Sequence, residues 1–526
     1  MSEPAPPSPP EPRRPNGEKL AARRKRSRTE RAGGRRSKTP PPLVQVDPED
    51  GEPQSLTDWL KGEARTGVPG AGVSFVLHAL LLIAMALYVI HQPTFDDGPL
   101  SLGWATGRET DQAVPDTPPT VSPIAMIPRE KPKSAPKPLA SNTKRSGRKV
   151  IPVDVSRALS LRSQRGRQGT VGGEGEGNKV RRAMNLGLGW LASQQKSGGN
   201  WQLHDGYPDA GYQPLRTDTG ATALALLAFL GDGHTPIAGN YQTEVANGLR
   251  WLKSVQKADG DFHDFDERGR QTAYYAHSMA TLAMCEAYAM TGDKKYREPV
   301  ENGIDFLLRS QQPNQGGWKY MPQDVDTEGD LSVTGWALMA MHTCRMAGIS
   351  IDDKEFGLAS QFLDAVASRD GALYRYQPSD QPQNVTPAMT ASGLLGRQWL
   401  GWEADDRAML DGVDWLLQPK FLPDWSGGRR NVYEWYYVAQ VLHNLGSGPW
   451  KDWFGRVQAL IVDNQRSRGS RKAPNDVLGS WDPANPAGAR DEHSHIGGRL
   501  YLTVMCLLTL ETPVRHAPIY SNEEDE

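Results

Sequence analysis

The stretch Phe306-Leu-Leu-Arg-Ser-Gln-Gln, followed by Gly317-Trp318, is one copy of a pattern that recurs along the chain. An aromatic or large apolar residue opens a short helical stretch, a Gln or another polar residue stops it, and a Gly usually precedes a second aromatic residue. The copies begin at Trp190, Trp251, Phe306, Phe362, Trp415 and Leu460. A period of about 55 residues fits a helix pair with its loops, and such a unit must stack on its neighbours to bury its apolar face.

Between these copies lies a second set of helices that are apolar on more than one face, a pattern typical of helices buried all round. Their predicted bounds are Thr219–Leu230, Thr272–Met290, Leu331–Ala347, Pro387–Leu400, Val432–Leu445 and Arg499–Leu510. The helices that carry the repeat, such as Val180–Gln195 and Val245–Gln256, are amphipathic with charged faces. Six outer amphipathic helices that alternate with six inner apolar ones predict an all-α fold, a closed (α/α)6 toroid over residues 179–515.

Helix start and stop signals agree with these bounds. Thr386-Pro387 places a capping hydroxyl before a Pro at the first helical position. Asn431 and Glu434 have the spacing of a capping box, and Asp330 precedes another inner helix. The left-handed residues expected after helix ends are Gly231, Gly292, Gly348 and Gly446.

The first 67 residues are Pro-rich and charged, and Lys19 to Lys38 holds ten Lys or Arg against one Glu. Such a block stays solvated and disordered. It could attract anionic lipid or nucleic acid, but a topology signal is the favoured interpretation because of the segment that follows. No specific nucleic-acid partner is therefore expected.

Residues 68–90 contain no charged residue and are long enough to cross a hydrocarbon core. More than sixty residues precede this segment, so we interpret it as an uncleaved transmembrane signal anchor that contacts membrane lipid. The positive-inside rule places the N-terminal tail in the cytoplasm and the toroid outside it. Residues 91–178 form a predicted Pro/Gly-rich linker, and residues 516–526 an acidic tail.

The three cysteines, Cys285, Cys344 and Cys506, lie in apolar helical stretches of different repeats. They are interpreted as small buried hydrophobic residues rather than as a disulfide framework. No Cys or His pair has the spacing of a metal site, and no metal or other cofactor is expected.

The pattern aromatic–Leu–x3–Gln with a following Gly–x–Trp resembles the QW repeat of the terpenoid cyclase and protein prenyltransferase superfamily. Gly335-Trp-Ala-Leu-Met-Ala-Met and Gly498-Arg-Leu-Tyr-Leu-Thr are similar to segments of prenyltransferase and squalene-oxidase repeat proteins of the squalene-cyclase type. The resemblance covers residues 180–515. It implies the toroid fold, and it implies that the Gln and Trp of each repeat tie helix ends together.

The resemblance also implies that the inner helices direct their N-termini to one end, where the family's active cavity opens. Converging helix N-termini favour acidic side chains or anionic ligands. The candidate catalytic residues are Asp330, Glu434 and His493, and the candidate ligand-binding residues are Asp218, Tyr275, Asp326, Trp336 and Trp435. Helix capping for the two acids, surface exposure for the histidine and core packing for the aromatic residues remain the structural alternatives.

The family's cyclases protonate their substrate through a DxDD motif. At the matching position this chain has Thr327-Glu328-Gly329-Asp330, so only the last acid is present. The sequence therefore leaves several functions open. A toroid that binds an apolar or polymeric ligand is favoured. The alternatives are a terpenoid cyclase or prenyl-transfer enzyme that uses Asp330, a scaffold for protein or envelope polymer, and a polysaccharide-active toroid with two carboxylates.

Overall fold

The computed structural model describes residues 159, 161–162, 176–204, 215–263, 272–322, 327–446, 448–467 and 477–520. All of them belong to one compact unit, Pro99–Glu526. The predicted cytoplasmic tail and the predicted transmembrane segment 68–90 lie outside the described residues. Within the ranges given above, no helix is both long and apolar enough to span a bilayer.

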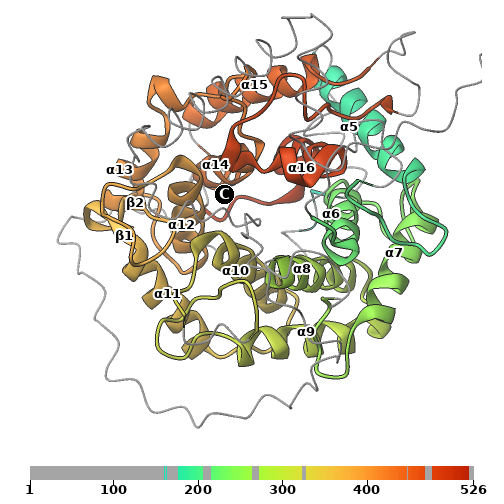
Figure 1. Ribbon diagram of the computed structural model, residues 1–526, viewed down its shortest axis with the longest axis horizontal. Helices are drawn as coiled ribbons and strands as arrows, with labels where there is room; N and C mark the ends of the chain where they lie inside the picture. Colours follow the sequence, from blue (N-terminus) through green and yellow to red (C-terminus); the bar gives the residue numbers. More distant parts are fainter. Residues whose placement is uncertain are drawn as a thin grey trace, which may run out of the picture. The chain divides into compact units, whose positions relative to one another are not determined.

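An inner and an outer layer of helices form a closed ring (Figure 1). The inner layer consists of α6 (Asp218–Gly231), α8 (Ala273–Thr291), α10 (Leu331–Met346), α12 (Pro387–Trp399), α14 (Val432–Leu445) and α16 (Ser494–Arg515). Each inner helix packs against the next, and α16 packs against α6. The outer layer consists of α5 (Glu176–Ser193), α7 (Gln242–Val255), α9 (Arg297–Arg309), α11 (Asp353–Val366), α13 (Arg407–Leu416) and α15 (Gly448–Asp463). Because α15 also contacts α5, both layers close, which confirms the predicted toroid.

The two layers differ in burial as their sequences predict. The inner helix α6 is buried at every position from Thr219 to Gly231. The outer helix α13 buries one stripe only, Met409, Gly412, Val413 and Leu416. A helix that is apolar all round needs partners on all sides, and the inner layer is the place in a toroid that provides them.

The fourth repeat departs from a purely helical unit. Its segment after α11 forms two short antiparallel strands, β1 (Ala367–Ser368) and β2 (Leu373–Tyr374). They flank a single turn of 3-10 helix, Arg369–Gly371. The other 3-10 turns in the described part of the chain are Lys294–Tyr296, Pro419–Phe421 and Arg490–Glu492.

The Gln and Trp of the repeat are structural ties, as the resemblance implies. In the third repeat the Gln311 side-chain amide donates to the carbonyl of Gly316 at 2.7 Å and to that of Glu355 at 3.2 Å. The indole nitrogen of Trp318 donates to the Leu307 carbonyl at 2.9 Å. Gln195, Gln256 and Gln465 each donate an equivalent pair of hydrogen bonds to two backbone carbonyls. Each Gln thus joins its own loop to the next outer helix, near the start of that helix except for Gln465, whose partner Ala183 lies farther along α5.

The predicted helix caps are confirmed with one exception. The side chains of Asp330, Thr386 and Asn431 accept backbone N–H groups at the starts of α10, α12 and α14. Gly292, Gly348 and Gly446 have positive φ. The prediction for Gly231 is wrong: it is the last helical residue of α6, and Gly233 takes the left-handed conformation. A Cβ at Gly231 would lie 2.2 Å from a carboxylate oxygen of Glu511, so close packing requires the glycine there.

The folded unit includes residues beyond both predicted ends of the toroid. Arg162, within the predicted linker, is buried and binds the Glu286 carboxylate at 2.9 Å and the Arg515 carbonyl at 2.9 Å. At the other end, Tyr520 is buried and donates its hydroxyl to the Trp402 carbonyl at 2.6 Å, although it lies in the predicted acidic tail. The folded unit therefore includes Arg162 and extends to Tyr520.

Candidate functional site

The starts of the inner helices lie together at one end of the ring. Tyr275 at the start of α8 bonds Ser332 at the start of α10, and Asn431 before α14 bonds Asp491 before α16. We call this end the mouth. It comprises the first turns of the inner helices and the described residues 201–204, 318–322, 374–386, 425–431 and 482–493 that precede them.

Asp330 is fully buried at the mouth and caps α10. One carboxylate oxygen accepts the Val333 amide at 2.8 Å and the Ser332 hydroxyl at 2.7 Å. The other accepts the Tyr376 hydroxyl at 3.0 Å. Burial raises the pKa of Asp330, and these donors oppose the rise. Both oxygens are bonded within the protein, so Asp330 joins the start of α10 to Tyr376.

Two tyrosines that the sequence interpretation missed extend this network outward. The Tyr376 hydroxyl is bonded to that of Tyr320, and both side chains are partly exposed. On the buried side, the Tyr275 hydroxyl lies 2.5 Å from the Ser332 hydroxyl. A continuous chain of hydroxyl groups therefore runs from the surface of the mouth to Asp330 and on to Tyr275.

A second acidic group lies at the start of α14, where Asn431 holds two carboxyl groups. Its side-chain oxygen accepts the Glu434 amide at 3.1 Å, as in a capping box. Its side-chain nitrogen donates to Glu434 at 3.3 Å and to Asp491 at 3.1 Å. Because both bonds start from the same nitrogen, the bonded oxygen of Glu434 and the bonded oxygen of Asp491 are separated by no more than the sum of the two hydrogen-bond lengths. Glu434 is partly exposed and Asp491 is exposed, so both are accessible to a ligand.

The two carboxyl groups differ from ordinary surface acids in their protonation. Burial raises the pKa of Glu434 to about 8, and the neighbouring Asp491 charge adds to the rise. The pKa of Asp491 is also raised, because nearby protein atoms keep water from part of the carboxyl group. At neutral pH the pair therefore holds a proton that Glu434 can donate, which is the requirement for a general acid.

A buried ion pair fixes the segments that carry these acids. Arg430 and Glu492 are both inaccessible to solvent and lie 2.8 Å apart. Glu492 also accepts the Val432 amide at 3.3 Å at the first residue of α14. The pair thus joins the start of α14 to the residues just before α16, next to both Glu434 and Asp491.

His493 is buried at the mouth in a left-handed conformation, with φ of 65°. Its ring packs edge-on against Tyr433, with centroids 5.8 Å apart. Burial, together with the charge of His495, lowers the pKa of His493 to about 3. The ring is therefore neutral at physiological pH and is a weak base.

The remaining predicted ligand-binding residues are dispersed. Asp218 accepts the side-chain amides of Asn200 and Gln202, each at 2.9 Å. Trp435 is buried against Trp425, with centroids 5.9 Å apart. Asp326 lies outside the described residues.

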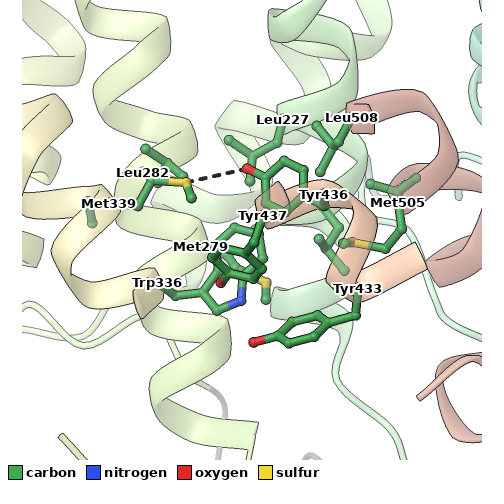
Figure 2. Packing of buried hydrophobic residues seen from close by; sticks show 14 of the residues in the cluster. Leu227, Met279, Leu282, Trp336, Met339, Tyr433, Tyr436, Tyr437, Met505 and Leu508 are labelled. Atoms are coloured by element: carbon green, nitrogen blue, oxygen red, sulfur yellow. Dashed lines mark hydrogen bonds between the residues drawn. The ribbon is translucent and has the colours of Figure 1, made fainter. Parts of the chain in front are cut away.

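Trp336 belongs to a cluster of side chains that meet on the axis of the ring (Figure 2). It stacks on Tyr436, with centroids 5.8 Å apart, and lies edge-on to Tyr437 at 6.4 Å. The residues labelled in Figure 2 come from five of the inner helices and are all buried: Leu227, Met279, Leu282, Trp336, Met339, Tyr433, Tyr436, Tyr437, Met505 and Leu508. We call this set the axial cluster. These buried side chains pack against one another between the inner helices.

A small cavity of about 40 Å³ lies at the end of the inner helices opposite the mouth. Its lining includes Met339, His342, Trp399, Gln440, Asn444 and His516. Sites for drug-sized ligands are typically about 300–1,000 Å³. This cavity has room for a few water molecules only.

The described residues provide no group of three or more His, Cys, Asp or Glu side chains arranged for a metal ion. The cysteines Cys285, Cys344 and Cys506 are buried and unpaired, as the sequence interpretation expected.

Comparisons with known proteins match parts of the chain or its fold. Residues 275–331 match the family model described as pectic acid lyase. Lanosterol synthase of Mus musculus is 31% identical over 144 residues, which cover 27% of this chain and 18% of that protein. The chain therefore aligns with less than a fifth of the length of this curated relative.

Several solved structures match the chain at low sequence identity and with TM-scores below 0.5. The GH76A α-1,6-mannanase from Salegentibacter sp. HEL1_6 has a TM-score of 0.44 at 11% identity, covering 64% of this chain and 98% of that chain. The type II terpene cyclase MstE from Scytonema has a TM-score of 0.41 at 15% identity, and the match covers 64% of this chain and 99% of that chain. The toroid of this chain is defined by its own two closed layers of helices.

Proposed function

We propose that the toroid binds a polysaccharide at its mouth and hydrolyses a glycosidic bond there. The observation that carries this proposal is the difference between the two levels of the ring: polar, accessible side chains at the mouth and buried, packed side chains deeper between the inner helices. The accessible carboxyl pair Glu434–Asp491 and the partly exposed Tyr320 and Tyr376 lie at a polar mouth, above an axial cluster that is packed with side chains.

An apolar ligand such as an isoprenoid would need a deep cavity lined by aromatic residues. The aromatic residues are present, but Trp336, Tyr436 and Tyr437 pack on one another across the axis and are nearly inaccessible. Asp330, the acid that a cyclase of this type would use, has both carboxylate oxygens bonded. These features favour a ligand that approaches the mouth from outside.

The mouth offers the groups that carbohydrates require. Tyrosine combines a flat apolar ring with a hydroxyl group, which suits the two kinds of surface on a sugar. The segment that matches the pectic acid lyase model includes Tyr275 and Tyr320. If residues 68–90 anchor the chain and place the toroid outside the cytoplasm, an envelope polysaccharide is the natural substrate class.

In this proposal Glu434 donates a proton to the leaving glycosidic oxygen, and Asp491 is the carboxylate partner. Glycosidases whose two carboxyl groups are about 5–5.5 Å apart form a covalent intermediate, whereas a spacing of about 6.5–9.5 Å leaves room for a water molecule to attack directly. The shared Asn431 nitrogen brings one oxygen of each acid within reach of the narrower spacing. The geometry therefore favours a retaining mechanism with Asp491 as nucleophile.

The test is binding of the full-length chain in detergent to a panel of polygalacturonate, α-1,6-mannan, starch, heparin and peptidoglycan, followed by titration of released reducing ends. We expect at least one polymer to bind and to be cleaved. Tyr376→Ala should weaken binding about tenfold, the loss typical of one aromatic contact. Tyr288→Ala, which removes a partly exposed tyrosine at the opposite end of α8, is the control and should bind normally. Failure of every polymer to bind would reject the proposal.

A second candidate is a terpenoid cyclase that uses Asp330 as its acid. The identity of 31% to part of lanosterol synthase favours it. Incubation of the same preparation with squalene and with polyprenyl diphosphates, followed by mass spectrometry, separates the two. Conversion that disappears in Asp330→Asn would support the cyclase, and absence of any product would count against it.

A further inference from the structure

We propose that the cavity at the end of the inner helices opposite the mouth is a binding site for one monovalent copper ion, Cu(I). Its ligands are the imidazole rings of His342 and His516 and the thioether of Met346. The site is separate from the carboxyl pair at the mouth, and it does not depend on the polysaccharide function proposed above. It assigns a ligand to a part of the fold that the proposed reaction does not use.

The cavity is bounded by three inner helices and by the segment that follows α16. His342 and Met346 lie near the end of α10, Trp399 ends α12, and Asn444 lies in the last turn of α14. His516 directly follows α16 and completes this part of the lining. The volume of about 40 Å³ is too small for a sugar or an isoprenoid, but it accommodates a single ion.

His516 presents a ring nitrogen that the protein does not satisfy. Its Nε2 is inaccessible to solvent and has no hydrogen-bond partner within the ranges that the structure describes. The residue is held in place, because its backbone carbonyl accepts the Nε2–H group of His443 at 2.7 Å. An unpaired buried polar atom is unfavourable, and native proteins pair nearly all of them. The partner of this nitrogen is therefore a water molecule or a bound ligand, and the other groups in the lining decide between them.

His342 and Met346 add a second imidazole and a thioether. They are four positions apart on α10, so their side chains lie on the same face of that helix. The His342 ring stacks on Trp399, with centroids 5.5 Å apart and an interplanar angle of 18°, which fixes its orientation. Met339 also lines the cavity, but its sulfur already accepts the Tyr436 hydroxyl at 3.4 Å. The end of α10 thus contributes one nitrogen and one sulfur donor.

The donors are neutral and include a soft sulfur atom, which selects Cu(I). Burial lowers the pKa of His342 to about 4 and that of His516 well below its ordinary value, so both rings are neutral at physiological pH. None of the described residues that line the cavity carries a carboxylate or a thiolate. Calcium and magnesium need oxygen ligands, and structural zinc sites have four ligands that often include thiolates. Thioether sulfur favours Cu(I), and imidazole also binds copper.

The electrostatic surroundings suit one positive charge. The C-terminal ends of α10, α12 and α14 meet at this cavity, and the C-terminus of a helix carries partial negative charge. The positive side chains nearby have acidic partners. Arg515 and Arg162 share the Glu286 carboxylate, at 2.6 and 2.9 Å, and Arg345 is paired with Asp353 at 2.7 Å. A monovalent ion with neutral ligands adds the smallest charge that a metal can bring to such a site.

Anaerobic titration of the full-length chain in detergent tests the site. The probe is Cu(I) presented as its bicinchoninate complex, and the readout is the loss of the absorbance of that complex as the protein takes up the ion. We expect uptake of one ion per chain, without competition from Zn²⁺ at the same concentration. His342→Phe, His516→Phe and Met346→Leu each remove one donor atom. Each should lower the affinity for Cu(I) by about tenfold or more, the loss typical of a perturbed metal site.

Two controls separate this site from other copper ligands. Met339→Leu removes the neighbouring sulfur of the same cavity, which is already hydrogen-bonded, and should bind Cu(I) like the wild type. Cys285→Ala combined with Cys344→Ala removes the buried thiols of α8 and α10 and should also bind normally. If uptake depends on the cysteines and not on the three proposed ligands, the site is overturned.

Thermal unfolding provides a second readout. A ligand that binds only the folded state stabilises it, so Cu(I) should raise the melting temperature of the wild type and of Met339→Leu, but not that of His516→Phe. Without copper, His516→Phe should melt at the wild-type temperature or above it, because it removes an unpaired buried nitrogen; its loss of binding is then not a loss of folding. No uptake by the wild type, or equal uptake by the wild type and all three ligand variants, would show that the cavity holds water only and would reject the site.

Discussion

The side-chain nitrogen of Gln465 donates to the carbonyl of Ala183, 282 positions earlier in the chain, at 2.8 Å. The same nitrogen donates to the Gly479 carbonyl at 2.8 Å. Gln311 and the other repeat glutamines make this pair of bonds between neighbouring repeats, but here it joins the last repeat to the first outer helix, α5. The contact that ties one repeat to the next therefore also closes the ring.

Gln465→Ala should destabilise the toroid by about 1–3 kcal/mol, because it leaves two carbonyl groups without their donor at a buried position. Chemical denaturation of the full-length chain measures the change. Gln194→Ala is the control, since Gln194 bonds only the adjacent Ser193 side chain and is partly exposed. Equal stability of the two variants would mean that the closing contact contributes no more than a surface hydrogen bond.

Gly479→Ala tests the close approach at the same junction. Gly479 has φ of 94°, and a Cβ there would lie 2.2 Å from the Leu186 carbonyl oxygen on α5. Gly401 has nearly the same φ, 93°, but nothing lies within 4 Å of its Cβ position. Gly401→Ala should therefore lower the free energy of unfolding by about 1–2 kcal/mol, because of the left-handed backbone alone. Gly479→Ala should lower it clearly more, because the clash adds to that cost. Similar unfolding midpoints for the two variants would contradict the clash.

The raised pKa of Glu434 predicts how stability depends on pH. The folded protein holds this proton up to about pH 8, whereas the unfolded chain releases it near its ordinary value of 4.5. The folded state therefore binds more protons between these two values, and its stability falls as the pH rises through that interval.

Glu434→Gln should remove this component, so its stability should fall less than that of the wild type between pH 5 and pH 8. Urea unfolding at several pH values measures the difference. Glu298→Gln, at an exposed position of the outer helix α9, should keep the slope of the wild type. Parallel curves for the wild type and Glu434→Gln would show that Glu434 titrates normally.

Cleavage should retain the anomeric configuration, because Asn431 holds Glu434 and Asp491 close together. Proton NMR of the first product formed reports the configuration directly. Glu434→Gln and Asp491→Asn should each lower the cleavage rate by about 100-fold or more, the size of a general acid–base contribution. An inverted product would place the two carboxyl groups farther apart during the reaction than the structure has them.

Glu492→Gln should be among the most destabilising conservative changes at the mouth. It leaves the Arg430 guanidinium buried without its counter-ion, which typically costs about 3–5 kcal/mol. Asp411→Asn breaks the exposed pair with Arg407 and should cost less than about 1 kcal/mol. Calorimetry of both variants checks the contrast. A small loss in Glu492→Gln would mean that water or the Asp482 and Pro483 carbonyls satisfy Arg430 by themselves.

The architecture was predictable from sequence because it depends on patterns that repeat. The predicted bounds of α14, Val432–Leu445, match the structure residue for residue, and the caps at Asp330 and Thr386 follow from local side-chain chemistry. The error at Gly231 has a different origin. Only the fold reveals that Glu511, 280 positions later, packs against that glycine.

The site was less predictable, although one signal was present. Tyr320 and Tyr376 each lie two residues after the repeat aromatic, in Trp318-Lys-Tyr320 and Tyr374-Arg-Tyr376. Residues two apart on an extended segment share a face, so this position could have been examined in every repeat. No local pattern reveals that Trp336 fills the axis, since that depends on side chains from helices scattered over some 280 residues.

Closure of the ring at Gln465 and Gly479 has a consequence for how the protein comes apart. An open stack of repeats can lose its terminal unit first and unravel inward, so it unfolds in stages. In this ring each inner helix has a neighbour on both sides, and no repeat is terminal. Unfolding should begin only when one junction breaks, and the remaining repeats should then follow together in a single cooperative transition.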